Sequence, residues 1–264
     1  MKIFDIDSPF MRFLTKFADL MILNIATIIF CVPSLIVGYA ILSVYLDYGT
    51  ISLLVVLILL LVSFPIGAAL TGMHYVLLKM VRDEESYILK SFWKSFRENF
   101  KQATALWYIV AGVATVLLVD LWYMSKSSAS FPLLFRYILV AVSLVLYMFS
   151  LYIFPLQSKF VNPVKNTLKN SALMAIMALP KTLLMFGINV VVLLLLYFFE
   201  GQMVPVILVL GLSGPGFLHA LLYNKTFKKF EPEDEDAHLS EEEELNRAIS
   251  RMDEASDDGN SNNE

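Results

Sequence analysis

The sequence has 264 residues, of which 58% are hydrophobic and 17% are charged, with a mean hydropathy of +0.67. A soluble globular domain is about 45–50% apolar and about 25% charged. Several apolar runs exceed the roughly 18 residues that mark a membrane-spanning helix. Composition therefore excludes an ordinary soluble domain and predicts an all-α, polytopic transmembrane helical bundle.

The charge is divided between two regions of the chain. Residues 231–264 hold 14 acids and two bases, whereas the first 230 residues hold 18 bases and 10 acids. So acidic a stretch cannot bury enough apolar surface to fold alone. We therefore expect a transmembrane domain over residues 1–230 and an acidic, disordered cytoplasmic tail over residues 231–264.

The beginning of the chain has the pattern of an amphipathic helix that leads into the first span. Ser8 is a capping residue, and Pro9 fits the first helical position. This segment is expected to lie at the membrane interface, with docking to a partner as the alternative. The apolar run Leu20–Tyr45 is longer than the core of a signal peptide and lacks an A-x-A site, so we expect it to be retained as an anchor.

Six spans are predicted. They cover about Leu20–Tyr45, Ile51–Met80, Ala103–Met124, Leu133–Leu156, Thr182–Phe199 and Val204–Leu222. The second span contains Pro65 and the sixth contains Gly211 and Pro215, so both are expected to kink, because proline removes a backbone donor and clashes with the preceding turn.

The distribution of Lys and Arg predicts the orientation. With the N-terminus inside, 18 of these residues lie on the inner side and only Lys126 and Arg136 lie outside. Because cytoplasmic loops carry the excess of basic residues, both termini are predicted to be cytoplasmic. The two longest loops, Arg82–Gln102 and Ser158–Lys181, are then also cytoplasmic, and partners are expected there.

The first inner loop has the pattern of an amphipathic helix with an aromatic and a basic stripe. These candidate interfacial or partner-binding residues are Lys90, Phe92, Trp93, Lys94, Phe96, Arg97, Phe100 and Lys101. The favoured interpretation is a helix in the membrane plane, with aromatics in the lipid bilayer and bases toward anionic head groups. Docking on a partner subunit stays open. Nucleic acid is disfavoured, because adjacent acids and the acidic tail would repel phosphates.

Four ionisable residues within or beside the spans are candidate intramembrane polar sites: Asp19, His74, Asp120 and His219. Such residues are functional candidates by default, but each lies toward a span end, which favours an interfacial or structural role. Asn24 and Asn189 are expected to form helix–helix contacts.

The sequence contains none of the common catalytic, nucleotide-binding or metal-binding motifs. It contains no GxxxxGK[ST], GxGxxG, HExxH or CxxC, and its single cysteine, Cys31, cannot form an internal disulfide. We therefore expect no enzymatic activity, no catalytic residues, no cofactor and no metal.

Three blocks carry a family resemblance: Gly67–Tyr75, Leu78–Glu85 and Lys90–Gln102, with support from Asp7–Phe10 and Gly214–Phe217. Over about Phe4–Phe230 the chain resembles the YesL-like family of bacterial integral membrane proteins, also called domain of unknown function 624.

The resemblance implies a multi-pass protein of the bacterial plasma membrane. Members are often found beside genes for ABC-type importers of oligosaccharides. It thus implies a non-enzymatic accessory component of carbohydrate uptake, with ABC-type sugar importer subunits as partners. The alternative function is a transporter or channel in its own right. The family supplies no catalytic or ligand residues.

Overall fold

The structure is a computed structural model that describes residues 8–49, 53–84, 87–126, 133–231 and 249. The chain divides into two units, Met1–Lys225 and Thr226–Glu264. The acidic region predicted to be a disordered tail lies outside the described residues, except for Glu231 and Ile249.

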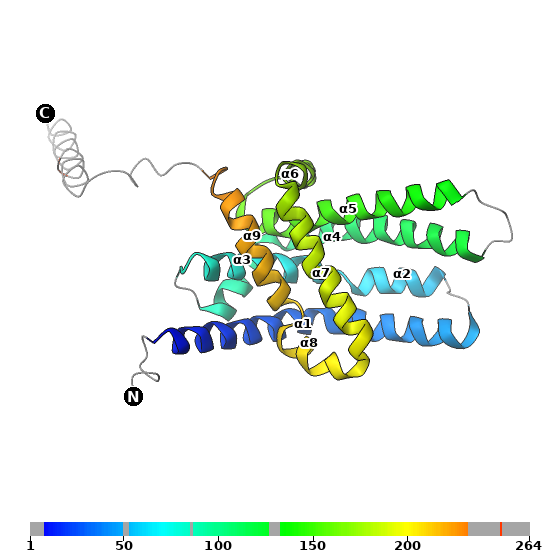
Figure 1. Cartoon of the computed structure of the whole chain (residues 1–264), viewed down its shortest axis with the longest axis horizontal. Coiled ribbons are helices and arrows are strands. Elements are labelled where there is room, and N and C mark those ends of the chain that lie inside the picture. The colour runs from blue at the N-terminus through cyan, green and yellow to red at the C-terminus, as the bar shows by residue number, and fades with distance from the viewer. Residues whose placement is uncertain (1–7, 50–52, 85–86, 127–132, 232–248, 250–264) are drawn as a thin grey trace, which may run out of the picture. The chain divides into compact units, whose positions relative to one another are not determined.

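The described secondary structure is entirely helical. The elements are α1 (Pro9–Tyr48), α2 (Leu53–Val62), α3 (Ile66–Val81), α4 (Ile88–Lys126), α5 (Leu133–Lys159), α6 (Val164–Met177), α7 (Leu179–Phe199), the 3-10 helix η1 (Glu200–Met203), α8 (Val204–Leu210) and α9 (Ser213–Phe227). Figure 1 shows α1, α2, α4 and α5 running along one direction, while the shorter α6 lies across it and packs on α5.

The number of spans agrees with the prediction. Among the described residues, five stretches are long and apolar enough to cross a membrane, and they belong to α1, to α2 with α3, to α4, to α5 and to α7. Helices α8 and α9 pass the same test together, bent by 53°. Counted as one span, this pair brings the total to six. The all-α, polytopic bundle is confirmed, and the orientation of the termini stays a prediction.

Local sequence explains both ends of α1. The Ser8 side chain accepts a hydrogen bond from the Met11 backbone N–H at 3.2 Å, and Pro9 is the first helical residue. The helix ends at Gly49, whose φ of 68° is in the left-handed region that favours glycine. The predicted start of the helix is therefore correct.

The two inner loops differ from the prediction. The amphipathic helix of the first loop is continuous with the third span, and together they form the 39-residue α4. In the second loop the sequence analysis missed α6. Three of its four buried residues, Thr167, Ser171 and Ala175, are polar or small, and the fourth is Met174, so a search for apolar periodicity does not detect it.

Helix α3 is enclosed by its neighbours. Eleven of its 16 residues are buried, and it packs most extensively against α4, with further contacts to α1 and α5. Small residues allow this close approach. A Cβ atom added at Gly67 would collide with the Ala103 carbonyl oxygen and would lie 2.7 Å from the Trp107 Cβ atom.

The break between α2 and α3 lies at Ser63–Pro65, where the second span was predicted to kink. Side chains of α4 bond to the interrupted backbone. Thr104 Oγ1 donates to the Phe64 carbonyl oxygen at 3.1 Å, and the Tyr108 hydroxyl donates to the Leu61 carbonyl oxygen at 3.4 Å. Trp107 Nε1 donates to Ser63 Oγ at 2.8 Å. The break is thus held by three side chains of one helix.

The break between α8 and α9 is held by one side chain of α1. The fully buried Asn24 donates from Nδ2 to the carbonyl oxygens of Ile207 and Leu208 at 2.9 and 2.8 Å. Its Oδ1 accepts from the backbone N–H groups of Leu212 and Ser213 at 2.8 and 3.0 Å. Asn24 therefore bonds to backbone groups on both sides of the bend, which confirms its predicted helix–helix role.

We predict that Gly67→Val destabilises the protein by about 1–3 kcal/mol, because α4 must move away from α3 to admit the new side chain. The measurement is the thermal unfolding midpoint of the purified protein in detergent. Gly112→Ala in α4 is the control, since a Cβ there meets no atom within 4 Å. An unchanged midpoint for Gly67→Val would refute the close approach.

We predict that Asn24→Val lowers the free energy of unfolding by about 2 kcal/mol or more, because it removes four hydrogen bonds to the backbone at the bend. Thr27→Val is the control: Thr27 is equally buried on α1, but its hydroxyl donates only within its own helix, to the Leu23 carbonyl oxygen at 2.8 Å. Equal losses for the two variants, by thermal or denaturant unfolding, would contradict the bridging role of Asn24.

Candidate partner-binding surface

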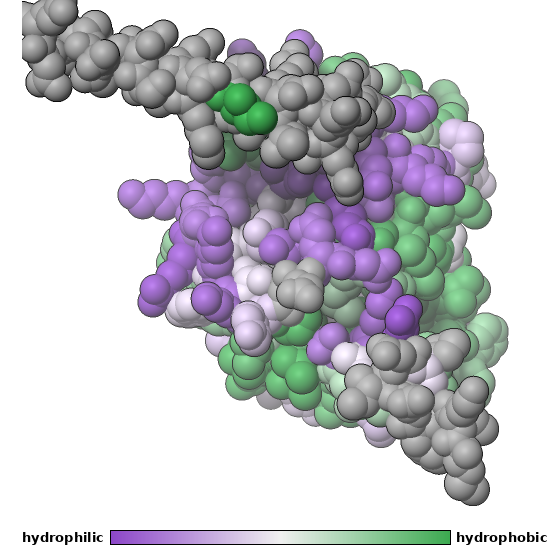
Figure 2. All heavy atoms as spheres, turned by 90° about the vertical axis from the view of Figure 1, so that its left-hand side faces the viewer, coloured by the Kyte–Doolittle hydropathy of each residue, from purple (hydrophilic) through white to green (hydrophobic). Residues whose placement is uncertain are grey.

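The polar side chains of the bundle gather at one end. Figure 2 shows hydrophilic residues over the end where α1 and α4 begin and α3 ends. Four exposed bases of α4 lie in this part of the chain: Lys90, Lys94, Arg97 and Lys101. We call these four residues the basic surface. The structure thus places the predicted basic stripe on the exterior of the protein.

The aromatic side of the same helix segment faces protein rather than lipid. Phe92 and Phe96 are only 3% and 6% exposed. Their ring centroids lie 6.1 and 4.6 Å from that of Phe30 on α1. At Gly72 on α3, an added Cβ atom would be only 3.0 Å from the Phe92 carbonyl oxygen. Because Gly72 has no side chain, α4 can pack closely on α3, and the expectation that these two rings lie in the bilayer is wrong.

The other two aromatic candidates are less enclosed. Trp93 is 42% exposed, and its ring lies 5.0 Å from the guanidinium carbon of Arg97. Phe100 is partly buried, and its centroid lies 5.5 Å from that of Phe96. The structure therefore brings the four predicted aromatics together, with Phe92 and Phe96 inside and Trp93 at the border with the basic surface.

A polar network joins α4, α5 and α6 behind the basic surface. Gln157, which is 2% exposed, donates from Nε2 to Gln102 Oε1 at 2.7 Å and to Asn99 Oδ1 at 3.1 Å. Its Oε1 accepts from Thr167 Oγ1 at 3.1 Å. The sequence analysis missed this network. The sequence feature that could have revealed it is Gln157, a polar residue two positions after Pro155 and near the end of an apolar span.

An ion pair links α1 to the turn after α3. Lys16 Nζ donates to Asp83 Oδ1 at 2.7 Å. This hydrogen bond, together with the charge of Lys16, holds the pKa of the Asp83 carboxyl below its usual value. Asp83 has a φ of 55°, a conformation that aspartate tolerates better than most residues. Both side chains are well exposed, so the pair orients the turn more than it stabilises the fold.

The four intramembrane polar candidates do not form one site. His74 is buried, and its Nδ1 is hydrogen-bonded to the Tyr223 hydroxyl at 3.2 Å. His219 is also buried and donates from Nε2 to the Met185 carbonyl oxygen at 3.1 Å. Asp19 is partly buried on α1, and Asp120 is exposed on α4. The two histidines therefore link α3, α7 and α9.

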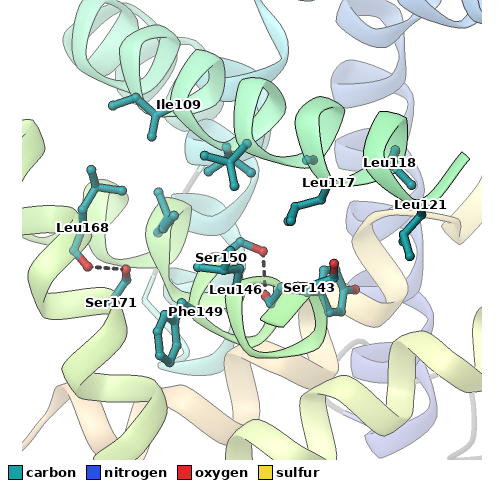
Figure 3. Close-up of a pocket in the computed structure, with 15 residues that line it drawn as sticks. Ile109, Leu117, Leu118, Leu121, Ser143, Leu146, Phe149, Ser150, Leu168 and Ser171 are labelled. Atoms are coloured by element: carbon teal, nitrogen blue, oxygen red, sulfur yellow. Dashed lines mark hydrogen bonds between the residues drawn. The ribbon is translucent and has the colours of Figure 1, made fainter. Parts of the chain in front are cut away.

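A largely apolar pocket lies between α4 and α5. It has a volume of about 420 Å³ and is lined mainly by Leu, Ile, Val and Ala side chains (Figure 3). Its serine hydroxyls are bonded to the backbone of their own helices. Ser143, Ser150 and Ser171 donate to the carbonyl oxygens of Leu139, Tyr147 and Leu168 at 2.8, 2.7 and 2.8 Å. The pocket suits an apolar group rather than a sugar, whose hydroxyls need polar partners.

We predict that Gln157→Met lowers the free energy of unfolding by about 1–3 kcal/mol, because the side chain keeps its length but loses three hydrogen bonds. Gln202→Met is the control, since Gln202 is exposed on η1. Thermal unfolding in detergent should separate the two variants. Equal midpoints would show that the network contributes nothing to stability.

The comparison with known proteins bears on the same part of the chain. Residues 20–121 match a family model described as Protein of unknown function, DUF624. No curated protein and no solved structure matches the chain. The matched segment contains Asn24, the break between α2 and α3, all of α3 and the basic surface. Over residues 20–121 this integral membrane protein therefore matches the DUF624 family predicted from the sequence, while the YesL name stays a prediction.

Proposed function

We propose that this chain is a non-enzymatic accessory protein of the bacterial plasma membrane that takes part in carbohydrate uptake. In this proposal the basic surface docks on subunits of an ABC-type oligosaccharide importer. The observation that carries the proposal is the fixed presentation of four exposed bases on one rigid helix. The link to carbohydrate uptake rests on the family resemblance described above.

The packing of α4 supports a docking role. Phe92 and Phe96 hold the helix against α1 and α3, so the bases on the opposite side keep a fixed register. A preformed charged surface loses little conformational entropy on association, and complementary charge accelerates the encounter. The predicted orientation places this surface in the cytosol, where the ATP-binding subunits of ABC-type importers lie.

Two observations favour an accessory role over transport by this chain alone. Broken helices can line substrate sites in transporters, where freed backbone groups bind the substrate. Here side chains of the protein bond to backbone groups at both breaks, through Asn24 at one and through Thr104 and Tyr108 at the other. The pocket between α4 and α5 is largely apolar and offers little to a hydrophilic solute.

We predict that affinity capture of the full chain from native-host membranes recovers importer subunits, and that Lys90→Glu with Lys94→Glu reduces this recovery by about tenfold. The reason is that two exposed bases become acids without any loss of buried contact. Quantitative mass spectrometry of the captured proteins is the measurement.

The control exchanges two exposed bases outside the basic surface, Lys165→Glu with Lys169→Glu on α6. It should capture as much importer as the unaltered chain. Capture of the chain alone under gentle solubilisation, or equal recovery by both double variants, would contradict the proposal.

A further inference from the structure

A second feature of the polar end is a groove where α3, α4 and α5 meet. It has a volume of about 860 Å³. Tyr75 of α3, Arg97 and Lys101 of α4, and Lys159 of α5 contribute to its lining. Among the lining residues that the structure describes, three are bases and one, Glu98, is an acid. Its charge therefore favours an anionic ligand.

Three amide side chains in the lining of the groove are held in place by hydrogen bonds. Gln157, Asn99 and Gln102 belong to the lining, and the hydrogen bonds of Gln157 to the other two fix these amides. Because Gln157 bonds to both α4 and α6, the helices that carry Arg97, Lys101 and Lys159 are held in a defined relation. The three basic residues therefore line a preorganised groove, which reduces the entropic cost of binding.

The donors at the groove suit a phosphate group. Arg97 lies over the ring of Trp93, and a guanidinium held in this way keeps its in-plane N–H groups to donate to two oxygens at once. Lys101 and Lys159 add two ammonium groups from different helices. A phosphate has several acceptor oxygens around one centre of charge, so it can accept from all three bases.

The position of the groove relative to the apolar spans is also informative. Lys159 is the last residue of the span Leu133–Lys159, and Tyr75 lies near the end of the span Leu53–Val81. The groove therefore lies where the apolar surface of the bundle ends, which is the depth of lipid phosphates in a bilayer. A soluble compound could also reach this depth from the aqueous side.

The geometry points to a phosphate-binding site in this groove, formed by Arg97, Lys101 and Lys159. Its ligand is an anionic phosphate, carried by a lipid head group or by a soluble phosphorylated compound. This site shares Arg97 and Lys101 with the basic surface, but Lys90 and Lys94, whose exchange tests the docking proposal, do not line the groove, so the two proposals can fail separately.

The test uses the purified full chain in neutral detergent. One arm titrates short-chain phosphatidylglycerol against short-chain phosphatidylcholine, and the other titrates inorganic pyrophosphate. Tryptophan fluorescence reports binding, because Trp93 contacts Arg97, and the thermal unfolding midpoint provides a second measurement. Saturable binding of phosphatidylglycerol alone identifies a lipid ligand, whereas saturable binding of pyrophosphate identifies a soluble one.

Three combined variants separate the groove from general electrostatic attraction. Arg97→Gln, Lys101→Gln and Lys159→Gln together should weaken binding by about tenfold or more, since each base near an anionic surface contributes about fivefold. Lys101→Arg with Lys159→Arg retains the charge and leaves Arg97 unchanged, and this double variant should stay within about threefold of the unaltered chain. Lys90→Gln, Lys94→Gln and Lys165→Gln remove three exposed bases elsewhere and should change the affinity by less than about twofold.

Three results would overturn the site: no saturable binding of either probe, equal affinity of the unaltered chain and the groove variant, or an equal loss in the variant without Lys90, Lys94 and Lys165. If the groove variant does not give a monodisperse protein, Lys101→Gln and Lys159→Gln are measured singly. Each should then weaken binding by about fivefold, and no change in either would also overturn the site.

Discussion

The carboxamide of Asn24 bonds to the backbone of a helix to which it does not belong. In the apolar part of a bilayer no water is present to bond to exposed N–H and C=O groups, so a broken span is stable only if protein atoms replace the missing bonds. Asn24 supplies two donors and one oxygen acceptor to the bend between α8 and α9. The first and the last span of the bundle are thereby joined.

The other broken span follows the same rule with different residues. At Ser63–Pro65 three side chains of α4 bond to the interruption, and just beyond it Gly67 lets α3 approach α4 closely. This packing places the aromatic side of α4 against α1 and α3, so its bases are directed outward. The basic surface and the groove beside it therefore depend on a break in a neighbouring helix and on the small residues that follow the break.

Much of this architecture follows from the sequence. Long apolar runs predict the spans, and Pro65 and the Gly-Pro segment after Gly211 predict where two of them are interrupted. Periodicity also predicts which side of α4 is aromatic and which is basic. It does not predict that Phe92 and Phe96 contact protein, because lipid and a protein core are equally apolar, and only the glycine on α3 distinguishes them.

The polar network around Gln157 was not predictable for a different reason. Its members Asn99, Gln102, Gln157 and Thr167 come from three helices, and as ordinary polar residues they share no pattern in the sequence. The same reasoning applies to Arg97, Lys101 and Lys159, which become one groove only when α4 and α5 are side by side. Helix α6 was missed because three of its four buried residues are polar or small.

Helix α4 has one further consequence. At 39 residues it is about 58 Å long, almost twice the hydrocarbon thickness of a bilayer, which is about 30 Å. The basic surface and one wall of the apolar pocket therefore belong to a single continuous helix, which contains no proline and which its glycine, Gly112, does not interrupt. Because the helix is continuous, a tilt caused by a partner at Lys90 or Lys94 also moves Leu117 and Leu121 at its other end. A change in membrane thickness that tilts α4 about its centre would move its polar end and its apolar end in opposite directions.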